Sequence, residues 1–326
     1  PRSKEAQQAI QNARQVYLEL DKVTAYALWL QSIEHSDFTN TDLDNTMFEA
    51  AEIKYLARKT PQAIISLNKY LSQFPDGLHS LKAHFYRAQA YFNTKENAKA
   101  GADYGFVVAQ KPNEHSEKSL SRLAQIYLEE NSWSQAIPLL KRLEQEANAP
   151  ENVLFAQSNI MKGMYENKNF SETVRYAETV LKNPKASTQL KSDAYVYSAR
   201  SAFKTKNFQK AENAYEKVTE LATGALKAEA LYHKAYFQHQ AKDFEASNKT
   251  VQQLAADFAS YKKWGIKGLL LMASNNEQLG DFFQATYILE SLIANYKDYP
   301  EMVKEAQKLL RAVREKETAQ SEATIN

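Results

Sequence analysis

Small residues recur along this sequence at a nearly constant interval, and this regularity restricts the fold more than any other feature. One series of small residues opens successive amphipathic segments, with gaps of 36–38 residues: Ala25, Ala63, Ala100, Ala136, Thr173, Ala211, Ser247 and Ala285. A second series lies twelve residues before the first and is almost entirely alanine: Ala13, Ala51, Ala88, Ala124, Met161, Ala199, Ala235 and Ala273. Two helices approach closely only where side chains are small, so each pair of positions predicts an antiparallel helix–turn–helix unit.

The scarcity of turn-forming residues supports long helices rather than sheets. The 326 residues include 8 Gly and 8 Pro, too few for a fold with many hairpins. Five prolines fall between the expected units, where a helix must stop: Pro75, Pro112, Pro150, Pro184 and Pro300. Pro138 is the exception, because it falls inside an expected helix over residues 133–143, where it predicts a kink or a late helix start.

Several segments carry a recognisable repeat signature. Residues 88–100, 124–136 and 280–285 combine the paired small positions with an Ala-Gln-x-Tyr motif or a Gly-Asp-Phe turn, and they resemble tetratricopeptide repeats. The period exceeds the usual 34 residues, and the eighth position is alanine rather than glycine. With the unit ends at residues 70–77 and 295–300, these features are most similar to exported repeat proteins of the Gram-negative envelope, which include periplasmic coordinators and outer-membrane-assembly lipoproteins.

The resemblance implies an all-α fold, a right-handed α-solenoid of about eight repeats with a C-terminal capping helix. We expect a single domain over residues 1–317, a capping helix over 300–317 and a disordered tail over 318–326. The expected repeats cover residues 5–37, 41–76, 79–112, 115–149, 152–184, 188–222, 225–261 and 264–297.

Charge and hydropathy exclude several classes of partner. The formal net charge is +2 and is spread over both halves, without the basic excess that nucleic-acid binding requires, so no nucleic-acid partner is expected. The longest apolar run, residues 269–273, is too short to cross a bilayer, so no transmembrane segment is expected. The chain opens at Pro1 rather than Met, and we therefore expect a portion upstream of it.

The sequence shows no pattern typical of a catalytic or metal-binding site. The sequence has no Cys, no glycine-rich phosphate loop and no Gly-x-Ser-x-Gly elbow. The pairs His79 and His84, and His233 and His239, are five and six residues apart, which does not place two rings on one helical face. We therefore predict no enzyme activity, no catalytic residue, no cofactor and no metal.

Binding is expected on the inner face of the solenoid, which the first helix of each repeat lines. With the second-series small residue as anchor, inward positions lie six before, three before and one after it. Arg and aromatic side chains often dominate interfaces, so these positions and their neighbours form a candidate binding strip. The predicted partner-binding residues are Lys82, Phe85, Gln89, Lys118, Arg122, Tyr197, Arg200, Tyr232 and Tyr236.

A known binding mode of the family does not fit. Tetratricopeptide co-chaperones hold a terminal carboxylate with polar residues from three repeats. Lys118 and Arg122 match the third element of that clamp, but Phe48 and Glu52 occupy the first and Tyr86 the second.

The function expected from these observations is a non-catalytic scaffold that binds a protein or peptide. Two alternatives stay open: a module that binds a peptide, glycan or lipid in the groove, and a regulatory domain of a longer protein. The resemblance implies a periplasmic or outer-membrane-associated location and association with an outer-membrane complex, while a cytoplasmic location also stays open.

Overall fold

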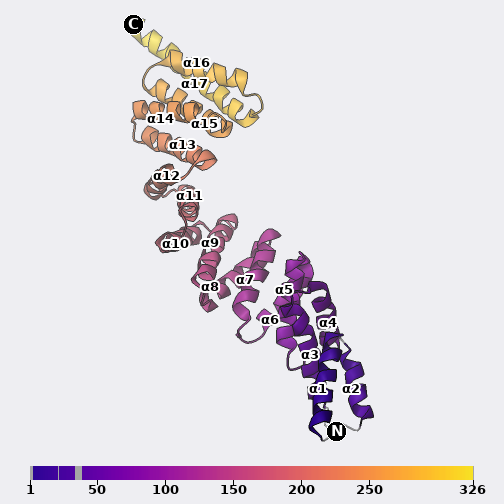
Figure 1. The fold of residues 1–326 in the computed structure, drawn as a ribbon. Helices are drawn as coiled ribbons and strands as arrows, with labels where there is room; N and C mark the ends of the chain where they lie inside the picture. Colours follow the sequence, from indigo (N-terminus) through magenta and orange to yellow (C-terminus); the bar gives the residue numbers. More distant parts are fainter. Residues whose placement is uncertain (1–2, 21, 34–38, 326) are drawn as a thin grey trace. The chain divides into compact units, whose positions relative to one another are not determined.

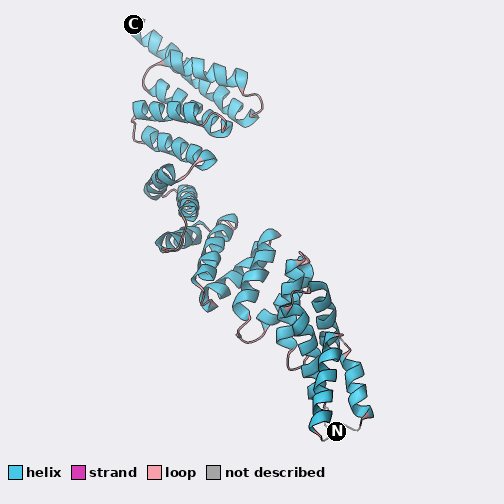
Figure 2. Cartoon of the chain, in the orientation of Figure 1, coloured by secondary structure: helices cyan, strands magenta, loops and turns pink. Residues whose placement is uncertain are grey.

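The protein is all-helical in the part of the chain that the structure describes, residues 3–20, 22–33 and 39–325 of a computed structural model (Figure 2). It divides into two compact units, residues 1–156 and 157–326. The sequence predicts one domain over 1–317, and the continuity of the two units stays a prediction. The division falls inside one helix, α9 (Pro150–Glu166).

Unit 1 stacks four helical pairs, whose members lie antiparallel and side by side (Figure 1). The pairs correspond to the first four expected repeats. Its helices are α1 (Lys4–Glu19), α2 (Val23–Ser32), α3 (Asn40–Leu56), α4 (Thr60–Gln73), α5 (Ser80–Asn93), α6 (Asn97–Ala109), α7 (Ser116–Glu129) and α8 (Trp133–Glu146).

Unit 2 continues the same pattern and ends with an additional helix. Its helices after α9 are α10 (Phe170–Lys182), α11 (Thr188–Lys204), α12 (Phe208–Leu221), α13 (Gly224–Gln240), α14 (Phe244–Asp257), α15 (Lys262–Gln278), α16 (Phe282–Asn295) and α17 (Pro300–Ile325). The final helix packs on α15 and α16 through Ala306 and Val313, which are buried. It continues eight residues past the expected end at residue 317, so the disordered tail predicted for residues 318–325 is wrong; Asn326 lies outside the described residues.

The recurring small residues form the contact between paired helices, as predicted. From the second repeat to the eighth, every member of both series is fully buried, and Ala235 and Ser247 illustrate one such pair. The prediction is wrong for the first repeat, where Ala25 is exposed and Ala13 is only half-buried. There α2 buries a different stripe, which includes Val23, Tyr26 and Leu30.

The turn inside each repeat is the same from repeat to repeat. A residue with φ between 56° and 80° follows each first helix from α3 onward: Arg58, Lys95, Asn131, Lys168, Lys206, Lys242 and Gly280. In the sixth repeat, the Lys206 N–H donates to the Phe203 carbonyl (3.1 Å) and the Asn207 N–H donates to the Ala202 carbonyl (2.8 Å). This pair of bonds is a Schellman motif, which satisfies the last carbonyls of the helix.

Because six of these seven left-handed positions hold a residue with a Cβ, they carry backbone strain. We expect Lys206→Gly and Lys242→Gly each to raise the free energy of unfolding by about 0.5–1 kcal/mol, measured by urea denaturation. The matched control is Lys249→Gly, at an exposed position inside α14, which should lower it by about 1 kcal/mol. Equal effects at the turn and in the helix would contradict this explanation.

Pro138 does not delay its helix. The helix α8 begins at Trp133 and continues through Pro138, so the expected late start is wrong. Proline removes the bond to the carbonyl of Ser134, and both residues are exposed. Water can therefore satisfy that carbonyl, which explains why the proline is tolerated.

Polar hydrogen bonds, in addition to apolar contacts, hold the helices together within and between the pairs. The hydroxyl of Tyr70 on α4 donates to the buried Asp44 on α3 (2.6 Å), and the Leu78 N–H donates to the same carboxylate (2.9 Å). In unit 2, Asn275 on α15 donates to Ser247 and Asn248 on α14, both at 2.8 Å. Each of these links occurs at a single interface, so the interfaces are alike in shape and different in chemistry.

Candidate functional site: a cationic pocket on the first helices of unit 2

The nine predicted partner-binding residues all lie on first helices, in two groups. One group belongs to unit 1 and the other to unit 2. They are distributed as Lys82, Phe85 and Gln89 on α5, Lys118 and Arg122 on α7, Tyr197 and Arg200 on α11, and Tyr232 and Tyr236 on α13.

In unit 1, the predicted residues with described contacts join successive helices. The Lys82 ammonium pairs with Glu52 on α3 (2.7 Å) and lies over the ring of Tyr86. Phe85 stacks on His115, with ring centroids 4.2 Å apart, and Arg122 lies 4.5 Å from the ring centroid of Phe92. Lys118 is exposed on α7, and burial together with nearby Arg122 lowers its pKa. Most of these groups therefore already have intramolecular partners.

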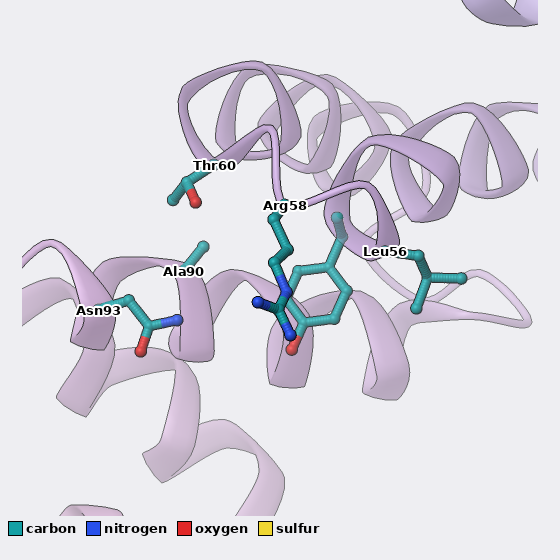
Figure 3. A pocket seen from close by; sticks show the side chains of 6 residues that line it. Leu56, Arg58, Thr60, Ala90 and Asn93 are labelled. Carbon is teal, nitrogen blue, oxygen red and sulfur yellow. The ribbon is translucent and has the colours of Figure 1, made fainter.

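A pocket of about 500 Å³ lies beside the second repeat's turn (Figure 3). Arg58, the left-handed turn residue, extends over it from one side, and Ala90 and Asn93 on α5 line the other. Thr60 and Leu56 complete the labelled rim. It contains none of the predicted residues and a single charged group, so it offers little to orient a ligand.

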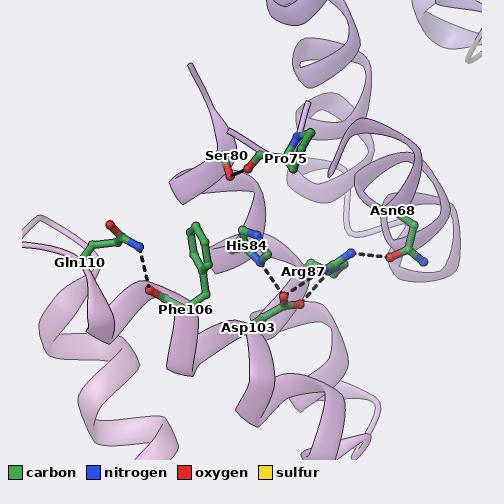
Figure 4. Close-up of polar contacts among 8 residues, drawn as sticks. All are labelled: Asn68, Pro75, Ser80, His84, Arg87, Asp103, Phe106 and Gln110. Carbon is green, nitrogen blue, oxygen red and sulfur yellow. Dashed lines mark hydrogen bonds and ion pairs between the residues drawn. The ribbon is translucent and has the colours of Figure 1, made fainter. Parts of the chain in front are cut away.

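Unit 1 also contains a polar cluster whose side chains bond to one another (Figure 4). Arg87 on α5 donates to both oxygens of the buried Asp103 on α6, from Nε at 2.8 Å and Nη2 at 2.7 Å, and reaches Asn68 on α4 from Nη1 at 2.8 Å. The His84 ring nitrogen Nδ1 lies 2.6 Å from the same carboxylate. Burial acts to raise the pKa of Asp103, but the bonds from Arg87 and His84 outweigh it and hold the pKa below its usual value. We interpret this cluster as a structural link.

In unit 2, Arg200 has a structural partner that the sequence analysis did not identify. Its guanidinium on α11 binds both oxygens of Glu229 on α13, from Nε at 2.7 Å and Nη2 at 2.6 Å. The Tyr215 hydroxyl on α12 also donates to Glu229 (3.1 Å), whose side chain is 6% exposed. The bond to Glu229 raises the pKa of Arg200, so the guanidinium stays protonated.

This ion pair forms one wall of a cavity of about 320 Å³, which we call the cationic pocket. The first helices α11, α13 and α15 supply most of its lining, and α9 and α12 supply one tyrosine each. The lining residues are Tyr165, Arg200, Phe203, Lys204, Tyr215, Glu229, His233, Lys263, Trp264 and Lys267.

The lysines of the cationic pocket surround an aromatic centre. The ammonium groups of Lys267 and Lys263 lie 5.1 Å and 5.7 Å from the ring centroid of Trp264, and Lys267 also lies 5.5 Å from that of Tyr232. Burial and the neighbouring Lys263 lower the pKa of Lys267. The positive charges of Lys263 and Lys267 therefore lie close together beside the Trp264 ring, which can pack against a ligand.

Of the nine predicted residues, only Arg200 lines the cationic pocket. Tyr232 touches it through Trp264, with centroids 5.5 Å apart, and Tyr236 packs on Phe203 at 5.4 Å. The binding role of all nine stays a prediction. Lys267 could have been found, because it stands six residues before Ala273 in the same register that selected Lys82 and Lys118.

His233 is enclosed at the base of this pocket. Its ring is stacked on Tyr215 with centroids 4.1 Å apart, it is 7% exposed, and its Nδ1 has no hydrogen-bond partner. Burial lowers the pKa of His233 to about 4. The folded protein therefore keeps this ring neutral at a pH where an exposed histidine would be protonated.

The stability of unit 2 should consequently fall in mild acid. Between pH 6.5, the usual histidine pKa, and about pH 4, the unfolded chain binds a proton at residue 233 that the folded chain does not. The contribution of His233 is complete above pH 6.5, and up to about 3 kcal/mol is lost as the pH falls to 4. Urea denaturation at a series of pH values should show a smaller loss for His233→Phe, which retains the stacking. Identical pH profiles would contradict the assignment.

Known proteins share the repeat and the fold of this chain. A family model described as tetratricopeptide repeat matches residues 267–299, which include all of α16 and most of α15. The C-terminal part of a tetratricopeptide-repeat-containing protein from Cytophaga hutchinsonii is similar in structure, with a TM-score of 0.53 and 16% identity over 79% of this chain and 98% of that chain. This protein has the tetratricopeptide repeat fold. No curated protein matches its sequence.

A second tetratricopeptide structure extends the likeness over more of the chain. It is a signal-transduction ATPase with a tetratricopeptide repeat sensor from Pyrococcus horikoshii, with a TM-score of 0.51 and 14% identity over 90% of this chain and 49% of that chain. At such identities the likeness concerns the fold alone. The matched segment begins at Lys267, the one lining residue of the cationic pocket that it contains.

Across residues 3–20, 22–33 and 39–325, no three His, Asp or Glu side chains are grouped so that they could hold a metal ion. Over the same described ranges, none of the helices combines the length and apolar character that a bilayer crossing needs.

Proposed function

We propose that this tetratricopeptide-repeat protein is a non-catalytic scaffold, and that it binds a segment of a protein partner on the face formed by α11, α13 and α15. The cationic pocket carries the proposal, since three consecutive first helices place aromatic and cationic side chains around one cavity. Such side chains dominate the energetics of many protein interfaces. The packed helices present them without an ordering cost at the moment of binding.

The size of the pocket favours this function over the alternative of a groove that encloses a glycan or a lipid. At about 320 Å³ it lies at the lower end of the range for drug-sized ligands, and its lysines are on an open helical face. It suits a few side chains of a longer ligand better than a whole enclosed molecule.

Site-specific photo-cross-linking in cells that express the protein tests the proposal. A benzoylphenylalanine at position 236 on α13 should cross-link a protein partner. The same group at position 287 on α16, where Tyr287 is exposed on a second helix, should not. Cross-linking from position 287 alone would place binding on the other face and contradict the proposal.

We also propose a cell-envelope setting, either periplasmic or associated with an outer-membrane complex. Its support is the resemblance of the long repeats and their unit ends to exported repeat proteins. Fractionation of the native cells, followed by immunodetection, tests it. Recovery in the cytoplasmic fraction would contradict it.

A further inference from the structure

We propose that the cationic pocket binds an internal acidic segment of the partner, with carboxylates at the lysines and an apolar or aromatic side chain against Trp264. This inference rests on the proposed function and adds the chemistry of the bound segment.

The charge balance of the pocket carries the inference. The one acid that lines it, Glu229, is occupied by both donors of Arg200 and by the Tyr215 hydroxyl. Lys204, Lys263 and Lys267 therefore remain as three positive charges around the cavity. Glu305 on α17 also acts on Lys267, but it does not line the cavity, so the lysines outnumber the acids in the lining.

In the free protein, the positive charges of these lysines repel one another. The charges of Lys263 and Lys204 both oppose the protonation of Lys267, which is half-buried. Unlike Arg200, none of the three lysines is held in a bidentate pair within the described structure. A ligand that brought about two negative charges would relieve the repulsion, whereas a neutral segment would leave it in place.

The geometry indicates a segment within a chain rather than a chain end. Lys204 and Lys263 are exposed on separate helices, α11 and α15, with Trp264 beside Lys263. Long flexible ammonium groups at the rim can each meet a separate side-chain carboxylate. The arrangement differs from a clamp built around one terminal carboxylate, so it requires no free end.

Binding of a labelled peptide to the full chain tests the inference. The probe is a ten-residue peptide of glutamate and aspartate with a central phenylalanine, acetylated and amidated, followed by fluorescence anisotropy. We expect binding that weakens with rising salt, and at least a tenfold increase in Kd for Lys263→Glu/Lys267→Glu. The matched control, Lys249→Glu, changes the charge of an exposed position on the second helix α14 and should leave the Kd within twofold of the original.

Further variants and competitors test whether the pocket recognises acidic side chains in particular. The double variant Lys263→Gln/Lys267→Gln removes the charges without adding acid, and circular dichroism of each variant checks that it is folded. Equal affinity for the glutamine-and-asparagine version of the peptide would overturn the inference. So would an equal loss with Lys249→Glu, or complete competition by millimolar inorganic phosphate or a single-stranded oligonucleotide. Should the cross-link from position 236 persist in any of these cases, the scaffold function would stand and only the acidic chemistry would fail.

Discussion

Replacing Arg200 with alanine should lower the free energy of unfolding of unit 2 by about 3–5 kcal/mol. Within the described residues, Arg200 supplies two of the three hydrogen bonds to the Glu229 side chain and the only cation paired with that carboxylate, which is 6% exposed. Its removal leaves a buried negative charge with a single neutral donor. Urea denaturation followed by the fluorescence of Trp264, the one tryptophan in residues 157–326, measures the effect in a Trp29→Phe/Trp133→Phe background.

A double variant distinguishes the lost charge from lost packing. Arg200→Met/Glu229→Leu replaces the ion pair with apolar side chains of similar size and should recover most of the stability, because no buried charge remains. If the double variant is as unstable as Arg200→Ala, the effect comes from packing. Arg200 was predicted as a partner-binding residue, and a loss of binding on its substitution would also reflect damage to the pocket wall.

Replacing Gly77 with alanine should destabilise unit 1 by about 2–4 kcal/mol. Gly77 lies between α4 and α5, where an added Cβ would stand 2.7 Å from Asp44 Oδ2, 2.7 Å from the Tyr70 hydroxyl and 2.8 Å from Phe74 Cβ. These contacts are too short, so the buried bond between Tyr70 and Asp44 must open or the turn must move. Urea denaturation followed by Trp29 and Trp133 in a Trp264→Phe background measures the loss.

The matched control is another glycine of the same unit. Gly105 lies inside α6, and an added Cβ there meets nothing within 4 Å. Gly105→Ala should therefore raise the free energy of unfolding by about 0.5–1 kcal/mol, as expected for a helix interior. A destabilised Gly105→Ala, or an unchanged Gly77→Ala, would contradict the account of these two positions.

The helical pairs and their buried seams were predictable because both depend on local spacing. Ala199 and Ala211, for example, are twelve residues apart, which places them opposite each other across one turn, and both are fully buried. The first repeat deviates because, within the described residues, it has a neighbouring pair on one side only. There Ala25 no longer needs to meet a closely packed helix, and bulkier residues define the seam.

The chemistry of the candidate site was less predictable, because it depends on residues from separate repeats. Glu229 and Arg200 are 29 residues apart, and no local pattern indicates that they form a pair. The lysines of the cationic pocket likewise come from α11 and α15, whose relative position follows from the packing of whole repeats. The repeat register could select Lys267 as inward-facing, but it could not show that Glu229 would be already neutralised.

The individual polar links have a consequence for the order of the repeats. The small residues lie between the two helices of a pair, so they set the shape of the repeat and do not distinguish one neighbouring repeat from another. The carboxylate of Glu229 on α13 does distinguish one neighbour from another, because its guanidinium partner, Arg200, lies on α11 of the preceding repeat. Exchange or deletion of the repeat that holds Arg200 would leave Glu229 as a buried anion without its cation, so electrostatics specify the order of the sixth and seventh repeats.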